Sequence, residues 1–265
     1  MPDGQLASFG RYDRTIQIWD VKTGSSQVLE GHEKGINCLA VMPDGRLASF
    51  GRYDGTIQIW DVKTGSSRVL GGHESSIKCL AVLPNGRLAS GSEDRTIRIW
   101  DVKKGNSRVL GGHKSLIKCL AVLSNGQIAG GGYNGTIRIW DAKTGISRVF
   151  EGHKGLIKCL AVLPNGQLAS GSEDRTIRIW DVKTGTSRVF KGHDSHVMFL
   201  VVLPDSNLAS AGSDRTVIFW DLAADKTSQI QRKGFVEAPI TCIAYVQKHH
   251  ILAVGTQVGI TFFPL

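Results

Sequence analysis

The 265-residue sequence lacks any long apolar stretch. A membrane-spanning helix needs about 18 or more consecutive apolar residues, and no run approaches that length. The chain also does not open with a charged segment followed by an apolar one, which is the pattern of a secretory signal peptide. We therefore expect a soluble intracellular protein with a cytoplasmic location.

The sequence also lacks the short motifs of common catalytic sites. It has no phosphate-binding glycine loop, no nucleophile elbow and no H-E-x-x-H segment. Lys-Thr-Gly together with Ser115 and Lys118 superficially resembles motifs of serine β-lactamases, but Lys-Thr-Gly recurs as a turn in several parts of the chain. We predict no catalytic residue, no enzymatic activity and no cofactor.

The sequence does contain an internal repeat. Its clearest copy runs from His153 to Asp181, and close copies run over 73–101 and 113–141. All six tryptophans are followed by aspartate; the last five are 40 residues apart and the first precedes the second by 41: Trp19, Trp60, Trp100, Trp140, Trp180 and Trp220. Self-similarity at a fixed period indicates a repeat architecture.

Within one copy, apolar residues alternate with others between closely spaced turns such as Pro164-Asn165-Gly166. This period-two pattern predicts strands. In the fifth copy we expect four of them, over Ile157–Leu163, Gln167–Ser170, Thr176–Trp180 and Ser187–Phe190. A four-stranded sheet recurring about every 40 residues with Gly-His and Trp-Asp signatures is typical of a propeller blade. The predicted fold is therefore an all-β propeller of antiparallel four-stranded blades, forming one domain over residues 1–265.

The Gly-His pairs, the Pro-Asn-Gly turns and the Trp-Asp pairs resemble those of the WD-repeat β-propeller family across almost the whole chain. The resemblance implies that a turn aspartate, the Gly-His histidine, a second-strand serine and the tryptophan form a hydrogen-bonded structural tetrad. Three copies meet the pattern: His73, Ser90, Asp94 and Trp100; His153, Ser170, Asp174 and Trp180; His193, Ser210, Asp214 and Trp220.

Other copies depart from this pattern. One extra residue separates Ser49 from Asp54, and the same insertion separates Ser8 from Asp13, which puts the register of the second strand there in doubt. In the fourth copy Gly130 and Asn134 replace serine and aspartate, so we expect a weaker or rearranged polar network.

The two ends are incomplete copies. Residues 1–4 match Met42-Pro43-Asp44-Gly45, so the first inner strand is missing, and residues 240–265 resemble three strands of a last blade without its outer strand. Seven blades of about 40 residues would need roughly 280. We favour seven blades with incomplete first and last ones. Imperfect closure of the ring, fewer blades, or a chain that is a fragment are the alternatives.

Cysteine is sparse, and its positions follow the repeat. Cys38, Cys79, Cys119 and Cys159 share one inner-strand position, and Cys242 takes the corresponding place in the last copy. Because equivalent positions lie in different blades, we expect small apolar side chains rather than disulfides. The His73 and Cys79 spacing recurs and could suggest a metal, but the histidines are assigned to tetrads, so no metal is predicted.

The net charge is +9, and part of it follows the repeat. Lysines recur after Trp-Asp, and arginines recur in the outer strand: Lys22, Lys63, Lys103, Lys143 and Lys183; Arg68, Arg108, Arg148 and Arg188. A basic rim of this kind could bind nucleic acid or anionic lipid. The alternative, which we favour, is a solvated outer edge protected against sheet pairing.

Differences among near-identical copies indicate a binding face, because packing holds scaffold positions constant. The family resemblance implies partners that dock on the Gly-His loops and on the turns between second and third strands. The variable residues there would line the channel mouth: Tyr12, Asn37, Tyr53, Ser76, Lys78, Glu93, Leu116, Lys118, Tyr133, Leu156, Lys158, Glu173, His196, Met198 and Thr241. Their lysines, leucines and tyrosines suit an acidic peptide with apolar anchors. A solvated rim without a partner is the alternative.

We therefore interpret the chain as a non-catalytic scaffold that binds a protein or peptide. A second hypothesis is a substrate receptor of a ubiquitin ligase, because Trp60 to Lys63 and Trp180 to Lys183 read W-D-V-K and resemble the family's adaptor-binding box. A nucleic-acid or lipid binder that uses the basic rim is a third.

Overall fold

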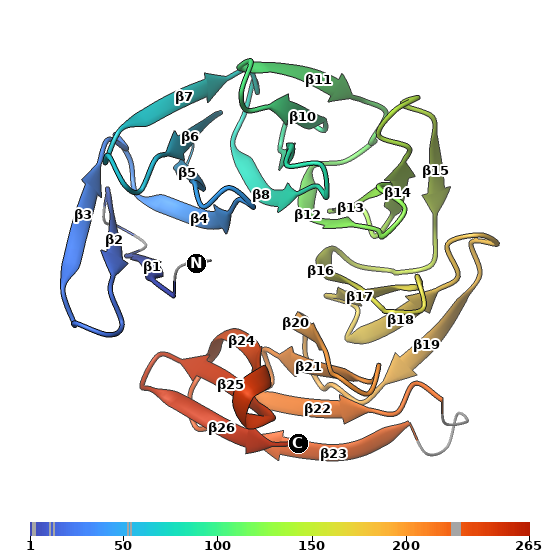
Figure 1. Ribbon diagram of the computed structural model, residues 1–265. Helices are drawn as coiled ribbons and strands as arrows, with labels where there is room; N and C mark the ends of the chain where they lie inside the picture. The colour runs from blue at the N-terminus through green and yellow to red at the C-terminus, as the bar shows by residue number, and fades with distance from the viewer. Residues whose placement is uncertain (2–3, 11, 13, 52, 54, 224–228) are drawn as a thin grey trace. The chain divides into compact units, whose positions relative to one another are not determined.

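The structure is a computed structural model that describes residues 1, 4–10, 12, 14–51, 53, 55–223 and 229–265. Its described part contains no α-helix, and the chain is an all-β propeller of seven antiparallel sheets, which we number as blades 1 to 7. Blades 2 to 6 have four strands each, whereas blades 1 and 7 have three (Figure 1). The predicted fold class and the two incomplete end blades are therefore confirmed.

The strands follow the chain order. Blade 1 contains β1 (Leu6–Phe9), β2 (Thr15–Trp19) and β3 (Ser26–Glu30). Blade 2 contains β4 (Ile36–Val41), β5 (Leu47–Gly51), β6 (Thr56–Trp60) and β7 (Ser67–Gly71). Blade 3 contains β8 (Ile77–Val82), β9 (Leu88–Ser92), β10 (Ile97–Asp101) and β11 (Asn106–Leu110). Blade 4 contains β12 (Ile117–Val122), β13 (Ile128–Gly132), β14 (Ile137–Trp140) and β15 (Ser147–Phe150). Blade 5 contains β16 (Ile157–Val162), β17 (Leu168–Ser172), β18 (Thr176–Trp180) and β19 (Ser187–Lys191). Blade 6 contains β20 (Val197–Val202), β21 (Leu208–Gly212), β22 (Thr216–Trp220) and β23 (Ile230–Phe235). Blade 7 contains β24 (Ile240–Val246), the 3-10 turn η1 (Gln247–His249), β25 (Ile251–Thr256) and β26 (Ile260–Pro264).

The four strands predicted for the fifth copy match β16 to β19 within two residues at each end. Each strand pairs antiparallel with the next one in the chain, so successive connections lie at alternate ends of a blade. The Gly-His loop and the turn after the second strand therefore share one end, which we call the histidine end. The Pro-Asn-Gly turn and the turn after Trp-Asp share the other end, which we call the lysine end.

The chain divides into two compact units. The first comprises residues 1–122, 126–130 and 140–146, and the second comprises 123–125, 131–139 and 147–265. Blades 1 to 3 belong to the first unit and blades 5 to 7 to the second, while blade 4 contributes residues to both.

The core within each unit lies between neighbouring blades. In the first unit Trp100 packs with Ile57, Ile59 and Leu70 of the preceding blade. The second unit repeats this arrangement with Trp220 against Ile177, Ile179 and Phe190. All of these side chains are at most 5% exposed. Burial of a large apolar side chain contributes about 1.5 to 3 kcal/mol, so the alternating pattern of each copy holds its blade against the next.

Turn chemistry ends the strands. At Leu83-Pro84-Asn85-Gly86 the glycine has a φ of 76° and donates its N–H to the Leu83 carbonyl at 2.9 Å. Glycine adopts this left-handed conformation without a steric penalty. After Trp-Asp, the side chain of Asp61 accepts the backbone N–H groups of Lys63 and Thr64 at 2.9 and 3.1 Å. The aspartate of the repeat is therefore a turn former at the lysine end.

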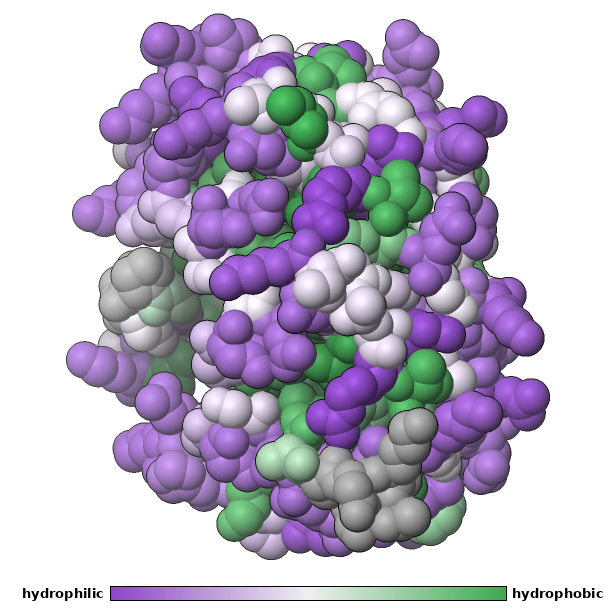
Figure 2. Space-filling model, turned by 90° about the vertical axis from the view of Figure 1, so that its right-hand side faces the viewer, coloured by the Kyte–Doolittle hydropathy of each residue, from purple (hydrophilic) through white to green (hydrophobic). Residues whose placement is uncertain are grey.

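The outer-strand arginines bridge neighbouring blades. Each donates through Nη1 to backbone carbonyls at the lysine end of the following blade: Arg68 to Lys103 at 3.1 Å, Arg108 to Lys143, Arg148 to Lys183 at 2.9 Å and Arg188 to Leu222 at 2.8 Å. The face that carries β15 and β19 is mostly hydrophilic, with separate apolar patches between the polar side chains (Figure 2). Because each outer-strand arginine donates to a carbonyl of the following blade, these arginines link neighbouring blades. They also contribute positive charge to the rim.

None of the five cysteines, all of which lie in the described part of the chain, forms a disulfide. Four are half-buried, and Cys242 is exposed, so the expected apolar role does not extend to the last copy. The pKa of Cys38 is raised to about 11 because burial disfavours the thiolate.

Candidate functional site

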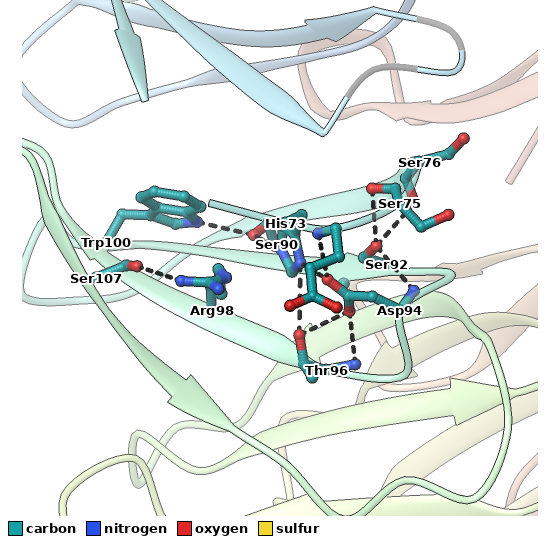
Figure 3. Close-up of polar contacts among 12 residues, drawn as sticks. His73, Ser75, Ser76, Ser90, Ser92, Asp94, Thr96, Arg98, Trp100 and Ser107 are labelled. Carbon is teal, nitrogen blue, oxygen red and sulfur yellow. Dashed lines mark hydrogen bonds and ion pairs between the residues drawn. The ribbon is translucent and has the colours of Figure 1, made fainter. Parts of the chain in front are cut away.

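A hydrogen-bonded chain crosses blade 3 from its tryptophan to its turn aspartate (Figure 3). Trp100 Nε1 donates to Ser90 Oγ at 2.8 Å, and His73 Nε2 lies 2.7 Å from the same oxygen. His73 Nδ1 lies 2.6 Å from Asp94 Oδ2. Because a carboxylate only accepts, Nδ1 carries the proton and Nε2 accepts from the serine hydroxyl. Every polar group in this buried chain has a partner.

The same bonds join the residues of the two other predicted tetrads. In blade 5, Ser170 Oγ is 2.8 Å from His153 Nε2 and 2.7 Å from Trp180 Nε1, and His153 Nδ1 is 2.8 Å from Asp174. In blade 6 the corresponding distances among His193, Ser210, Asp214 and Trp220 are 2.6, 2.8 and 3.0 Å.

A threonine extends each tetrad. Thr96, Thr176 and Thr216 donate from Oγ1 to the turn aspartate at 2.7, 2.6 and 2.6 Å. The sequence prediction missed these threonines, although each follows its aspartate by two residues.

Electrostatics in the tetrads of blades 3 and 6 favour a neutral histidine beside an ionised aspartate. Burial lowers the pKa of His73 and outweighs the opposing effect of Asp94. Burial alone would raise the pKa of Asp94, but hydrogen bonds from Thr96 and His73 lower it below its usual value. Neither group is poised for proton transfer near neutral pH, which suits a structural role.

Blade 2 keeps the register that the insertion put in doubt. Trp60 is paired with Leu47, as Trp100 is with Leu88, and both Trp60 Nε1 and His32 Nε2 reach Ser49 Oγ at 2.7 and 2.6 Å. The extra residue falls after β5, because the serine register is unchanged. Asp54 and Asp13 lie outside the described residues.

Blade 4 has a rearranged network, as expected. Trp140 Nε1 donates to the Gly111 carbonyl at 2.9 Å, because Gly130 offers no hydroxyl. A Cβ at Gly130 would lie 2.9 Å from Cζ3 of Trp140, so the indole occupies the space that serine takes elsewhere.

The predicted binding residues all come from loops or strand starts at the histidine end. In the first unit Tyr12, Asn37 and Tyr53 are exposed, whereas Lys78, Glu93, Leu116 and Lys118 are half-buried. In the second unit Tyr133, His196 and Thr241 are exposed, whereas Lys158, Glu173 and Met198 are half-buried. Ser76 and Leu156 are only 7% exposed, so they can offer a partner little surface.

Five of these residues stand at β-bulges. The register shifts between Ile77 and Cys79, so Lys78 is the extra residue of the inner strand. The same shift occurs at the equivalent residues of four other blades: Asn37, Lys158, Met198 and Thr241. A bulge leaves one residue out of the ladder and redirects its side chain. Sequence reasoning found the variable position but not the bulge.

The structure brings several predicted residues together within a blade. Lys78 Nζ lies 2.9 Å from Glu93 Oε1, and Lys158 Nζ lies 2.7 Å from Glu173 Oε1. The hydrogen bond from Lys158 is the main reason that the pKa of Glu173 is lowered. Neighbouring inner strands also pack together, β4 with β8 and β8 with β12 in the first unit, and β16 with β20 and β20 with β24 in the second. The bulge residues of adjacent blades thus form a row within each unit.

The two W-D-V-K segments expose neither their tryptophan nor a free aspartate. Trp60 and Trp180 are fully buried, and Asp181, like Asp61, binds the backbone of its own turn. Among the described residues, no group of three or more histidine, cysteine, aspartate and glutamate side chains could hold a metal ion. None of the described helices is long and apolar enough to cross a membrane.

The family model of the WD domain, G-beta repeat, matches residues 24–61, 65–101, 105–141, 145–181 and 185–221, which is more than half of the chain. The protein therefore belongs to the WD40 repeat family. Propellers of this family are in general scaffolds for protein interactions and are typically non-enzymatic. No curated protein matches the sequence at a significant level.

Proposed function

We propose that this protein is a non-catalytic scaffold that binds a protein or peptide through the histidine end of its blades. The observation that carries the proposal is the row of bulge residues. In blades 2, 3 and 7 the bulge residue lies between an isoleucine and a cysteine, but it is Asn37, Lys78 and Thr241 in turn, whereas in blade 6 Met198 lies between a valine and a phenylalanine. In blades 2, 3 and 7 the change is confined to the residue that the ladder leaves out, and packing does not explain it.

The charge and shape of this row suit an acidic peptide with apolar anchors. Lys118 differs from Lys78 and Lys158, because its copy has Tyr133 where the others have glutamate. A partner carboxylate could compete for the lysine of each Lys–Glu pair, and exposed tyrosines add apolar area with a hydroxyl. Cytoplasmic location is part of the same proposal, since five cysteines without a disulfide suit a reducing compartment.

The test is affinity capture followed by mass spectrometry with a matched pair of variants. We expect K78A/K118A/K158A to lose its captured partner, because it removes three cations of the histidine end. The control K63A/K103A/K143A removes the same charge from exposed lysines at the lysine end and should keep the partner. Circular dichroism must show both variants folded. Equal capture by the triple variant and the wild type would contradict this site.

The alternatives of a ubiquitin-ligase receptor and a basic-rim binder receive less support. The tryptophan and aspartate of W-D-V-K are used by the core and by the turn, and the outer-strand arginines donate to neighbouring blades. Failure to co-purify with an adaptor would exclude the first. Binding that does not weaken steeply with salt would exclude the second.

A further inference from the structure

A pocket of 570 Å³ opens at the histidine end of blade 5, entirely within the second unit. Its lining includes Lys154, Asp174, Arg175, Arg178, Val189 and Lys191. Four of these six side chains are cationic. The volume falls in the range of about 300 to 1,000 Å³ that is usual for ligand pockets.

The carboxylate in this lining is already used by the scaffold. Asp174 accepts His153 Nδ1 and the Lys154 N–H through Oδ2, at 2.8 and 2.9 Å. It accepts the N–H and Oγ1 of Thr176 through Oδ1, at 2.9 and 2.6 Å. Burial would raise the pKa of Asp174, but these bonds lower it far below its usual value. The aspartate is therefore held by donors of its own tetrad.

The four cations are left without a carboxylate partner. Among the residues that the structure describes, none of Lys154, Arg175, Arg178 and Lys191 forms an ion pair. Arg178 is fixed in place, since its Nη1 donates to Ser187 Oγ and its Nη2 to the Gly152 carbonyl, both at 2.8 Å, and its guanidinium lies 5.6 Å from the Trp180 ring centroid. The other three side chains are exposed and can close around a ligand.

Other blades show that the fold does not need these charges. The positions of Lys154, Arg175, Arg178 and Lys191 have equivalents in the other blades. In that order they are Glu33, Gly55, Gln58 and Gly71 in blade 2; Glu74, Arg95, Arg98 and Gly111 in blade 3; Lys114, Gly135, Arg138 and Glu151 in blade 4; and Asp194, Arg215, Ile218 and Phe235 in blade 6. All four positions are basic in blade 5 alone among these copies. The same scaffold accepts an acid where Lys154 stands and glycine where Lys191 stands.

We propose that this pocket binds the phosphate group of a phosphorylated serine or threonine on the partner polypeptide. A dianionic phosphate matches several converging cations better than a single carboxylate does, and lysine and arginine form strong charge-assisted bonds to its oxygens. The pocket is larger than one phosphate group, which leaves room for flanking residues. It also lies at the histidine end, where the scaffold meets its partner, so the peptide nature of the ligand rests on the proposed function.

The test measures binding of a degenerate peptide library with a central phosphoserine, beside the same library with serine, by fluorescence anisotropy. Wild type should prefer the phosphorylated library. The variant K154E/K191G carries the residues of blade 3 and should bind at least about tenfold more weakly, because two charge-assisted contacts are lost. K114E changes charge by two units in blade 4, as Lys154→Glu alone does in blade 5, and should leave binding unchanged.

A gain-of-function variant gives an independent readout. E74K/G111K completes the four cations in blade 3, where Arg95 and Arg98 already stand, and a Cβ at Gly111 meets nothing within 4 Å. Isothermal titration should then find two phosphopeptide sites in place of one. A site count that stays at one with E74K/G111K would overturn the proposal.

Other outcomes also decide the question. Equal binding of the two libraries, or an unchanged K154E/K191G variant, would overturn the phosphate site. Pocket-dependent binding of phosphoinositide vesicles or RNA without phosphopeptide binding would overturn the peptide as the ligand. If K78A/K118A/K158A loses the captured partner while K154E/K191G keeps it and the two libraries bind alike, the proposed function stands and this pocket is wrong.

Discussion

Removing the hydroxyl at the centre of one tetrad should cost far more stability than removing the same hydroxyl from the first blade. Ser170 Oγ serves Trp180 Nε1 at 2.7 Å and His153 Nε2 at 2.8 Å, and all three residues are buried. Ser170→Ala leaves two buried polar atoms without their partner. An orphaned buried group costs about 1 to 3 kcal/mol, so we expect a loss of about 2 to 4 kcal/mol in the free energy of unfolding.

The matched control is Ser8→Ala. Trp19 Nε1 donates to Ser8 Oγ at 2.8 Å, but Trp19 is 37% exposed, so water can replace the hydroxyl. This variant should lose less than about 1 kcal/mol. The length of the bond to tryptophan is nearly the same in the two blades, whereas Ser170 is buried and also binds a histidine.

The assay is denaturant unfolding followed by circular dichroism, together with amide hydrogen exchange of the peptide that contains β18. The exchange measurement is needed because repeat proteins can unfold in more than one step. Faster exchange should be confined to blade 5 and its neighbours. Equal losses for the two variants would refute the reasoning that buried satisfaction, not the bond itself, stabilises the tetrad.

Two further predictions concern packing and pH. A Cβ at Gly171 would lie 2.6 Å from Val197 Cγ1 and 2.7 Å from Cys159 Sγ, so Gly171→Ala should destabilise the protein by about 1 to 3 kcal/mol. Gly111→Ala, at an open position directly after β11, should be nearly neutral, and equal melting temperatures of the two variants would contradict this. Burial lowers the pKa of His73 and His193 below 6.5, so the unfolded chain binds more protons and stability should fall as the pH drops below about 6.5. The lowered pKa of Asp94 and Asp214 should cause a second loss of stability below about pH 3.8. Urea midpoints that rise between pH 7 and pH 5 would contradict the sign expected for the histidines.

The sequence predicted the strands and the incomplete end blades well, because alternation and turn residues are local signals. The strands of the fifth copy agree with β16 to β19 within two residues at each end. The prediction of a single domain over residues 1–265 stays a prediction.

What the sequence could not predict depends on distances across a blade. The pairing of Lys78 with Glu93 joins residues 15 apart in the chain, and the bulge at Lys78 depends on how β8 pairs with β9. The arginine contacts join residues about 35 apart, such as Arg148 and Lys183. No local sequence pattern indicates either the lysine–glutamate pair or the arginine–carbonyl bonds. The interpretation of these arginines as a solvated edge therefore missed their contacts between blades.

The arginine contacts also bear on how such a chain can lengthen. Arg68, Arg108 and Arg148 each lie in one repeat and reach carbonyls in the next, so a single copy contains both a donor and the acceptor for the copy before it. A duplication of about forty residues therefore inserts a blade that can already form these hydrogen bonds with the blade before it and the blade after it. The number of copies can change in evolution without any new residue being needed at the seams.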